Sequence, residues 1–137
     1  MSRKRINGIT MLGRSGVVSA KSPDEAKLET FKNRYSDRDY EISFKCPEFT
    51  SLCPVTGQPD FGEITITYVP DMSCLESKSL KLFINSFRNH NTFHEEAVNK
   101  IRDKIVEVLM PRRLEVLGVF KARGGIAITV KADYQGR

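Results

Sequence analysis

Long apolar runs are absent from this sequence. The longest ones, such as "GVV" at residues 16–18 and "IVEVLM" at residues 105–110, fall far short of the ~20 residues that a membrane-spanning helix needs. The N-terminal stretch "RKRINGITML" starts with basic residues but has no sustained apolar region behind them, unlike a secretory signal. We therefore expect a cytoplasmic protein that does not enter a membrane.

Cysteine and histidine are scarce, and their spacing is unlike that of common metal sites. The cysteines Cys46, Cys53 and Cys74 cannot all pair, so we expect free thiols in a reducing compartment. There is no Cys-x-x-Cys pair, and only the step from His90 to His94 has a usual zinc-ligand spacing. We expect no metal site. A glycine-rich dinucleotide-binding fingerprint is missing as well.

Excess positive charge is confined to the beginning of the chain. The formal net charge of the 137 residues is +5. Residues 1–34 hold eight Lys or Arg against three acidic residues, whereas the two signs balance from residue 35 onward. This distribution is more typical of a solvated tail than of a nucleic-acid-binding surface. We predict a basic, weakly structured leader over residues 1–38 and a single domain over residues 39–137.

Hydrophobic periodicity predicts six elements in that domain. Within residues 40–46, Ile42, Phe44 and Cys46 share one face and polar residues share the other, which is the pattern of a half-buried strand. Elsewhere apolar residues recur at i, i+3, i+4 and i+7, which indicates an amphipathic helix. The predicted strands are residues 40–46, 63–69, 113–121 and 125–131, and the predicted helices are residues 80–87 and 97–109.

The resulting order, β-β-α-α-β-β, favours an α+β fold. It fits an antiparallel four-stranded sheet with both helices on one face. The two outer strands of such a sheet are bare edges unless something covers them.

The stretch "FTSLCPVTGQPDFG" contains a candidate for chemistry. Cys53 lies in a predicted loop before Pro54, and Asp60 follows seven residues later, so one loop can bring a thiol and a carboxylate together. Free cysteines are more often buried as small apolar residues, which is our interpretation of Cys46. From spacing alone, both interpretations of Cys53 stay open.

Several other polar groups have an ordinary structural interpretation. "SCLE", residues 73–76, and "TFHE", residues 92–95, match the capping box, so Glu76 and Glu95 are expected to cap helices. Lys78 and Lys81 are expected on the solvated face of the first helix. The "RGG" at residues 123–125 is typical of a tight hairpin turn.

Three segments resemble the QueF family, the NADPH-dependent 7-cyano-7-deazaguanine reductases of queuosine biosynthesis, a tRNA modification pathway. They are "CPEFTSLCPVTGQPDFG", "ESKSLKLFINSFRNHNTFHEE" and "RGGI", and the likeness runs from about Tyr40 to Ile128. The resemblance implies a tunnelling fold, in which oligomerisation joins the sheets into a barrel. It also implies reduction of a nitrile to a primary amine with two NADPH.

The resemblance assigns roles residue by residue. Cys53 corresponds to the nucleophile, which forms a thioimide with the nitrile, and Asp60 to the proton donor. The substrate contacts correspond to Leu75, Glu76, Ser77, His94 and Glu95. The NADPH contacts correspond to Lys78, Lys81, Arg123, Gly124 and Gly125.

Glu76 and Glu95 open two consecutive antiparallel helices, so we expect their carboxylates at opposite ends of the helical hairpin. If both contact one deazapurine base, they come from different chains, which predicts a homo-oligomer with sites between subunits. Two alternatives remain: a zinc-dependent purine or pterin enzyme of the GTP cyclohydrolase type, and a non-catalytic binding module. No direct nucleic-acid binding is expected.

Overall fold

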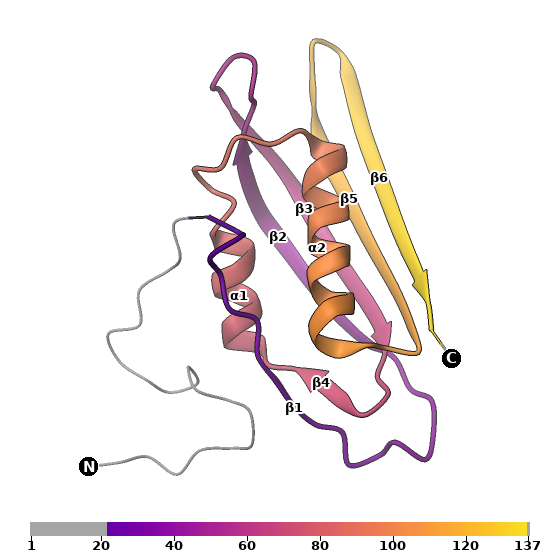
Figure 1. Ribbon diagram of the computed structural model, residues 1–137. Helices are drawn as coiled ribbons and strands as arrows, with labels where there is room; N and C mark the ends of the chain where they lie inside the picture. The colour runs from indigo at the N-terminus through magenta and orange to yellow at the C-terminus, as the bar shows by residue number, and fades with distance from the viewer. Residues whose placement is uncertain (1–21, 137) are drawn as a thin grey trace, which may run out of the picture.

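A computed structural model describes residues 22–136 of the chain. Its strands are β1 Thr30–Lys32, β2 Ile42–Leu52, β3 Pro59–Val69, β4 Ser73–Leu75, β5 Arg113–Arg123 and β6 Ile126–Gln135, and its helices are α1 Ser77–Asn85 and α2 His94–Leu109. The predicted β-β-α-α-β-β order is confirmed, and the short strands β1 and β4 are additional (Figure 1).

The main sheet is antiparallel, with the strand order β2-β3-β5-β6. Both helices lie on one of its faces, α1 against β2 and α2 against β5 and β6 (Figure 1). This arrangement confirms the predicted α+β fold. No helix within residues 22–136 has both the length and the apolar character needed to cross a membrane.

The core fills the space between this sheet and the two helices. It is built from alternate residues of the strands, such as Ile64 and Ile66 of β3, and from one face of each helix, such as Val98 and Ile101 of α2. Gly118 of β5 lies under α2, where a Cβ atom would come within 2.7 Å of the Val98 side chain. The glycine therefore lets the helix approach the sheet closely.

Two β-bulges reverse the alternation of side chains along the strands. In β2 the pairing with β3 shifts between Cys46 and Phe49, so even-numbered residues face the helices before the bulge and odd-numbered residues after it. Pro47 lies in this bulge, where its missing N–H leaves no ladder bond to lose. In β5 the pairing with β6 shifts between Phe120 and Arg123.

Residues 22–38 correct the prediction of a weakly structured leader that ends at residue 38. β1 pairs antiparallel with β4, with Thr30 opposite Leu75. Ala26 and Leu28 are buried in the core, 5% and 6% exposed. The prediction was wrong for this stretch because a three-residue strand is too short to show alternation. The rest of the predicted leader, residues 1–21, lies outside the described residues.

The two capping-box predictions are also wrong in detail. Ser73 belongs to β4, and Glu76 itself is the N-cap of α1, accepting hydrogen bonds from the N–H groups of Lys78 and Ser79. The N-cap of α2 is Phe93, which makes no side-chain capping bond. Pairing with β1 keeps the chain extended through Leu75, so the N-cap of α1 lies three residues after the Ser73 that the capping box predicts.

If residues 22–32 belong to the folded domain, Leu28→Ala should lower the free energy of unfolding by about 2–4 kcal/mol, because it leaves a cavity in the core. Urea denaturation followed by circular dichroism measures this change. The exposed neighbour Lys27 provides the control Lys27→Ala, for which we expect a change within about 0.5 kcal/mol. Equal effects of the two substitutions would contradict the burial of this segment.

Candidate active site

Cys53 lies in the hairpin loop that joins β2 to β3. Its N–H donates to the Gln58 carbonyl at 2.9 Å, and the Gly57 N–H donates to the Cys53 carbonyl at 2.8 Å. Gly57 has a φ of 71°, which closes this tight loop without strain. The sulfur is therefore carried by a short, internally bonded loop at the end of the sheet.

The three thiols differ in their surroundings. The Thr56 side chain hydrogen-bonds the Cys53 thiol and lowers its pKa; the backbone of Thr56 and Val55 acts in the same direction, against burial and the charge of Asp60. Burial raises the pKa of Cys46, and Cys74 is buried against Tyr40. Since the thiolate is the nucleophile, Cys53 is the reactive candidate among them.

Asp60 follows the same loop on β3 and faces the helices. Its side chain is 8% exposed, and Arg123 Nη1 donates to its Oδ1 at 2.6 Å. This hydrogen bond raises the pKa of Arg123, and the charge of Cys53 contributes in the same direction, so the three groups lie within electrostatic reach. The bulge in β5 explains the contact, because simple alternation would turn Arg123 to the other face.

The start of α2 lies beside the same loop. The Leu52 N–H donates to the His90 carbonyl at 3.0 Å, and the Thr92 N–H donates to the Leu52 carbonyl at 2.9 Å, which ties the α1–α2 connection to the end of β2. His94 stacks on Phe120 with ring centroids 4.0 Å apart. Its Nδ1 is buried and has no partner among the described residues. Glu95, the next residue, is exposed.

A second group of predicted site residues gathers at the start of α1. Glu76 is 2% exposed, and both of its carboxylate oxygens accept backbone N–H groups at 2.7 Å. The Ser79 hydroxyl accepts from the Glu29 N–H and donates to the Glu76 carbonyl, and the Glu76 N–H donates to the Glu29 carbonyl. The segment before β1 thus fixes the loop that carries Leu75, Glu76 and Ser77.

A cavity of about 310 Å³ lies beside this second group, between α1 and β2. Ser77 and Lys81 line it, together with Cys46 and Lys45. Neither Lys78 nor Lys81 has an ion-pair partner within residues 22–136. Lys81, which lies in this lining with Lys45 and Glu48, is the cation there that suits an anionic ligand.

The structure thus divides the predicted site residues into two groups. One group lies at the end of the sheet where the β2–β3 and β5–β6 turns approach the start of α2 (Figure 1). It consists of Cys53, Asp60, Arg123 and His94. The other group lies at the opposite end of the helical hairpin and consists of Leu75, Glu76, Ser77, Lys78 and Lys81. Within one chain, the first group holds the reactive thiol and the second holds the capping carboxylate.

Gly124 and Gly125 form the turn between β5 and β6. Their φ angles are 60° and 81°, and a Cβ atom at either position would meet nothing within 4 Å. The predicted hairpin turn is therefore confirmed, and its glycines are required by the backbone conformation. Arg123, which the family resemblance predicts to contact NADPH, is paired with Asp60 in this structure.

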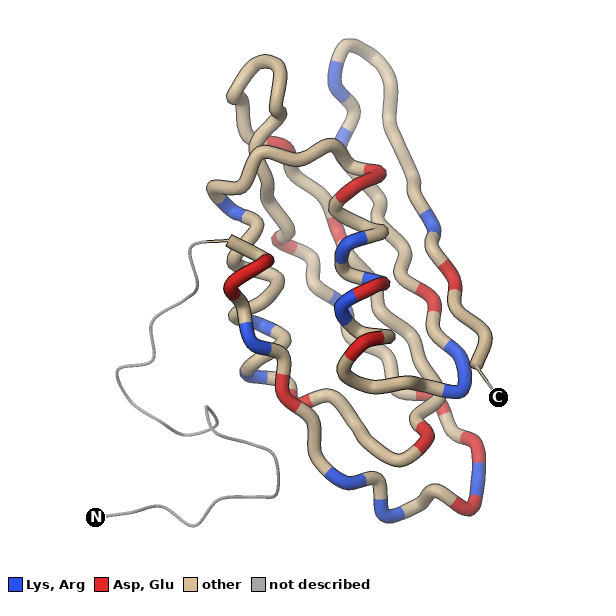
Figure 2. Tube along the Cα trace, in the orientation of Figure 1, with Lys and Arg blue, Asp and Glu red and all other residues tan. Residues whose placement is uncertain are grey.

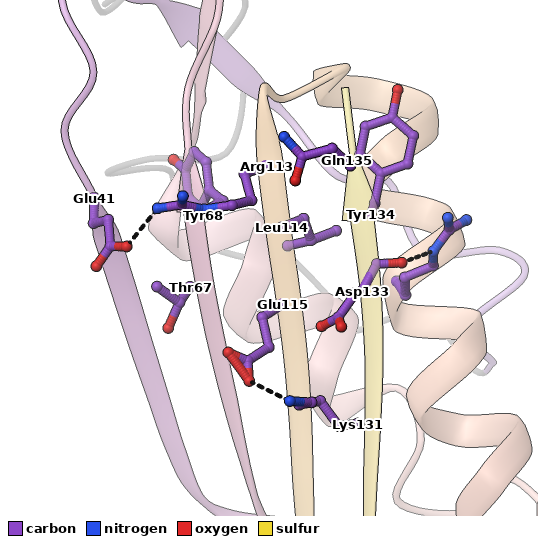
Figure 3. Close-up of a pocket in the computed structure, with 11 residues that line it drawn as sticks. Glu41, Thr67, Tyr68, Arg113, Leu114, Glu115, Lys131, Asp133, Tyr134 and Gln135 are labelled. Carbon is purple, nitrogen blue, oxygen red and sulfur yellow. Dashed lines mark hydrogen bonds and ion pairs between the residues drawn. The ribbon is translucent and has the colours of Figure 1, made fainter. Parts of the chain in front are cut away.

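A second hollow contains none of the predicted site residues. It measures about 710 Å³ and lies near the starts of β2 and β5 and the end of β6. Its charged residues neutralise one another, as in the pairs Glu41–Arg113 and Glu115–Lys131 (Figure 3).

Acidic and basic residues also interleave along α2 (Figure 2). No cluster of three potential metal ligands is found within residues 22–136.

Sequence comparisons identify similar proteins. The model of the QueF-like protein family matches residues 59–137. The NADPH-dependent 7-cyano-7-deazaguanine reductase of Streptococcus mutans is 51% identical over 134 residues, which cover 98% of this chain and 83% of the relative. The protein of the same name from Bacteroides thetaiotaomicron is 49% identical over 126 residues, which cover 92% of this chain and 83% of the relative.

A structural comparison agrees on the fold. The crystal structure of the archaeosine synthase QueF-Like in the apo form superposes with a TM-score of 0.62, covering 72% of this chain and 95% of that chain at 21% identity. Sequence identity near one half over almost the whole chain, a family model matching more than half of it, and a shared fold lead to one conclusion. The chain belongs to the QueF family.

Proposed function

We propose that this protein reduces the nitrile of 7-cyano-7-deazaguanine to the primary amine with two NADPH per turnover, as a step of queuosine biosynthesis. The names of its half-identical relatives support the reaction. The observation that carries the proposal is the placement of Cys53 next to a buried Asp60 that is paired with Arg123.

The side chains at this end of the sheet suit covalent activation of a nitrile. Asp60 takes the proton of the Cys53 thiol, the sulfur adds to the nitrile carbon, and Asp60 returns the proton to the nitrogen, which gives a thioimide. The thioimide carbon is a better hydride acceptor than the nitrile carbon. After one hydride and one proton are added, the C–S bond breaks and Cys53 leaves. A second hydride and proton complete the amine.

NADPH supplies both hydrides when it is bound. The residues present fit its anionic part, because Lys78 and Lys81 have no ion-pair partner among the described residues and Lys81 lines the cavity beside α1. His94, with its unpartnered Nδ1, and the exposed carboxylate of Glu95 are suited to hold the base. A guanine-like edge offers an N–H and an NH₂ group side by side, and one carboxylate can accept a hydrogen bond from each.

The separation of the two residue groups supports a site between subunits. α1 has nine residues and is therefore about 13 Å long, and the connection to α2 adds to this distance. A bicyclic base does not bridge Glu76 and Glu95 of one chain. We propose that the Cys53 group of one subunit meets the Glu76 group of another, so that the enzyme is an obligate homo-oligomer.

The first test is the reaction itself. The parent protein should oxidise two NADPH for each amine formed from 7-cyano-7-deazaguanine, whereas Cys53→Ala should be inactive because the thioimide cannot form. Absorbance loss at the nicotinamide band measures the reduction, and intact-protein mass spectrometry detects the adduct formed without NADPH. Cys74→Ala removes a thiol that does not line the cavity beside α1; it is the matched control and should keep both. An adduct on the Cys53→Ala variant would move the nucleophile to another thiol.

A second prediction concerns the proton. Asp60→Asn should lower kcat by ~10²-fold or more, because an amide does not exchange a proton with the thiol or the nitrogen at neutral pH. Binding of the base, measured by calorimetry, should change little. An active Asp60→Asn variant would remove Asp60 from the proposed mechanism.

The third prediction tests the intersubunit arrangement. Glu76→Gln and Glu95→Gln keep the side-chain shape, and each should be inactive alone. Mixed oligomers of the two should recover up to about a quarter of the parent activity, because some sites then combine two intact halves. Co-expression with different tags and tandem purification gives such mixtures.

The matched control for this experiment mixes Glu95→Gln with Cys53→Ala. Both substitutions fall in the same half of the site, so no site in the mixture is intact and no recovery is expected. Recovery in this control, or its absence in the Glu76→Gln and Glu95→Gln mixture, would contradict the arrangement.

A further inference from the structure

Ser51 is a buried serine whose hydroxyl has no hydrogen-bond partner. The residue is 0% exposed, and its Oγ and the Nδ1 of His94 are the two buried side-chain polar atoms without a partner within residues 22–136. Native proteins keep few such groups, because an unpaired buried hydroxyl loses its bonds to water without replacement. Both atoms lie at the end of the sheet that carries Cys53.

The strand register places Ser51 directly opposite Asp60. The two residues are Cα partners in the β2–β3 ladder. The bulge at Pro47 turns Ser51 toward the helices, and the regular alternation of β3 turns Asp60 toward the same face. Side chains that face each other in this way have Cβ atoms about 5 Å apart. A rotation about one side-chain bond of Ser51 can therefore direct its hydroxyl at the carboxyl group.

The carboxyl group of Asp60 has room for a second partner. Arg123 binds Oδ1, and no other side chain within residues 22–136 hydrogen-bonds this carboxylate. Arg123 itself is 45% exposed, so this partner can be displaced when substrate and cofactor enter. Oδ2 is then the oxygen through which a proton can pass.

We infer that Ser51 is a positioning residue that orients Asp60 during proton transfer, an inference that rests on the proposed function. A hydroxyl can donate a hydrogen bond to a carboxylate and can accept one from a carboxylic acid. Arg123 can only donate. Ser51 can thus hydrogen-bond Asp60 both as the carboxylate and as the carboxylic acid, whereas Arg123 stabilises only the carboxylate.

The test compares Ser51→Ala with Ser86→Ala. Ser86 is also buried, but its hydroxyl donates to the Phe83 carbonyl. Ser51→Ala should lower kcat about tenfold with KM for the base within about twofold of the parent value, because a hydrogen bond to a charged group is lost in the reacting complex only. Its Tm should not fall. Ser86→Ala should lower Tm and keep kcat.

Two further measurements show whether Ser51 acts through Asp60. In the Asp60→Asn background, Ser51→Ala should cause no further loss of kcat, because the group that it orients is already gone. Alkylation of Cys53 by iodoacetamide, followed by peptide mass spectrometry, should proceed at the parent rate, because it takes place in the substrate-free protein, where the Ser51 hydroxyl makes no hydrogen bond within residues 22–136.

Each opposite result would overturn the inference. These results are a parent-like kcat in Ser51→Ala, a loss confined to KM, an equal loss in the Asp60→Asn background, or slower alkylation of Cys53. An inactive parent protein would overturn the proposed function, and this inference with it. An active parent with an unaffected Ser51→Ala variant would overturn this inference alone.

Discussion

The site depends on two interruptions of regular strand geometry. Side chains on a strand alternate between faces, so one extra residue moves everything after it to the other face. The bulge at Pro47 turns Ser51 toward the helices, and the bulge before Arg123 brings that guanidinium to Asp60. Without them the strands would still pair, but these groups would face away from α2. The regular ladder therefore stabilises the fold, and its two bulges position Ser51 and Arg123 on the face that carries Asp60.

Regular elements could be predicted because each one faces a single core. The alternation of Ile64, Ile66 and Tyr68, and the helical spacing of Ile101 and Ile105, are direct consequences of burial on one side. β1 and β4 could not be predicted in this way. They are three residues long and pair across more than forty residues of chain, so no local pattern marks them. The same pairing places the N-cap of α1 at Glu76 and not at Ser73, as the capping box predicted.

The candidate site could be predicted in part for similar reasons. The spacing of Cys53 and Asp60 across a hairpin indicated their proximity, since a short loop brings its two ends together. The roles of Thr56 and Ser51 could not be found from spacing, because the bulge decides which face Ser51 occupies and the loop conformation decides what Thr56 contacts. Arg123 shows the same limit: its sequence neighbours indicate a turn, whereas its partner belongs to another hairpin.

The bond between Glu29 and Ser79 has a consequence for the order in which the protein forms. These residues are 50 positions apart, and the Glu29 carbonyl also accepts the N–H of Glu76. At ~5–20 residues per second, a ribosome needs roughly 3–10 seconds to add the residues between them. The segment from Ala26 to Lys32 is thus synthesised several seconds before β4 and the start of α1, with which it pairs. The loop that carries Glu76 reaches its native conformation only after this earlier segment packs against it.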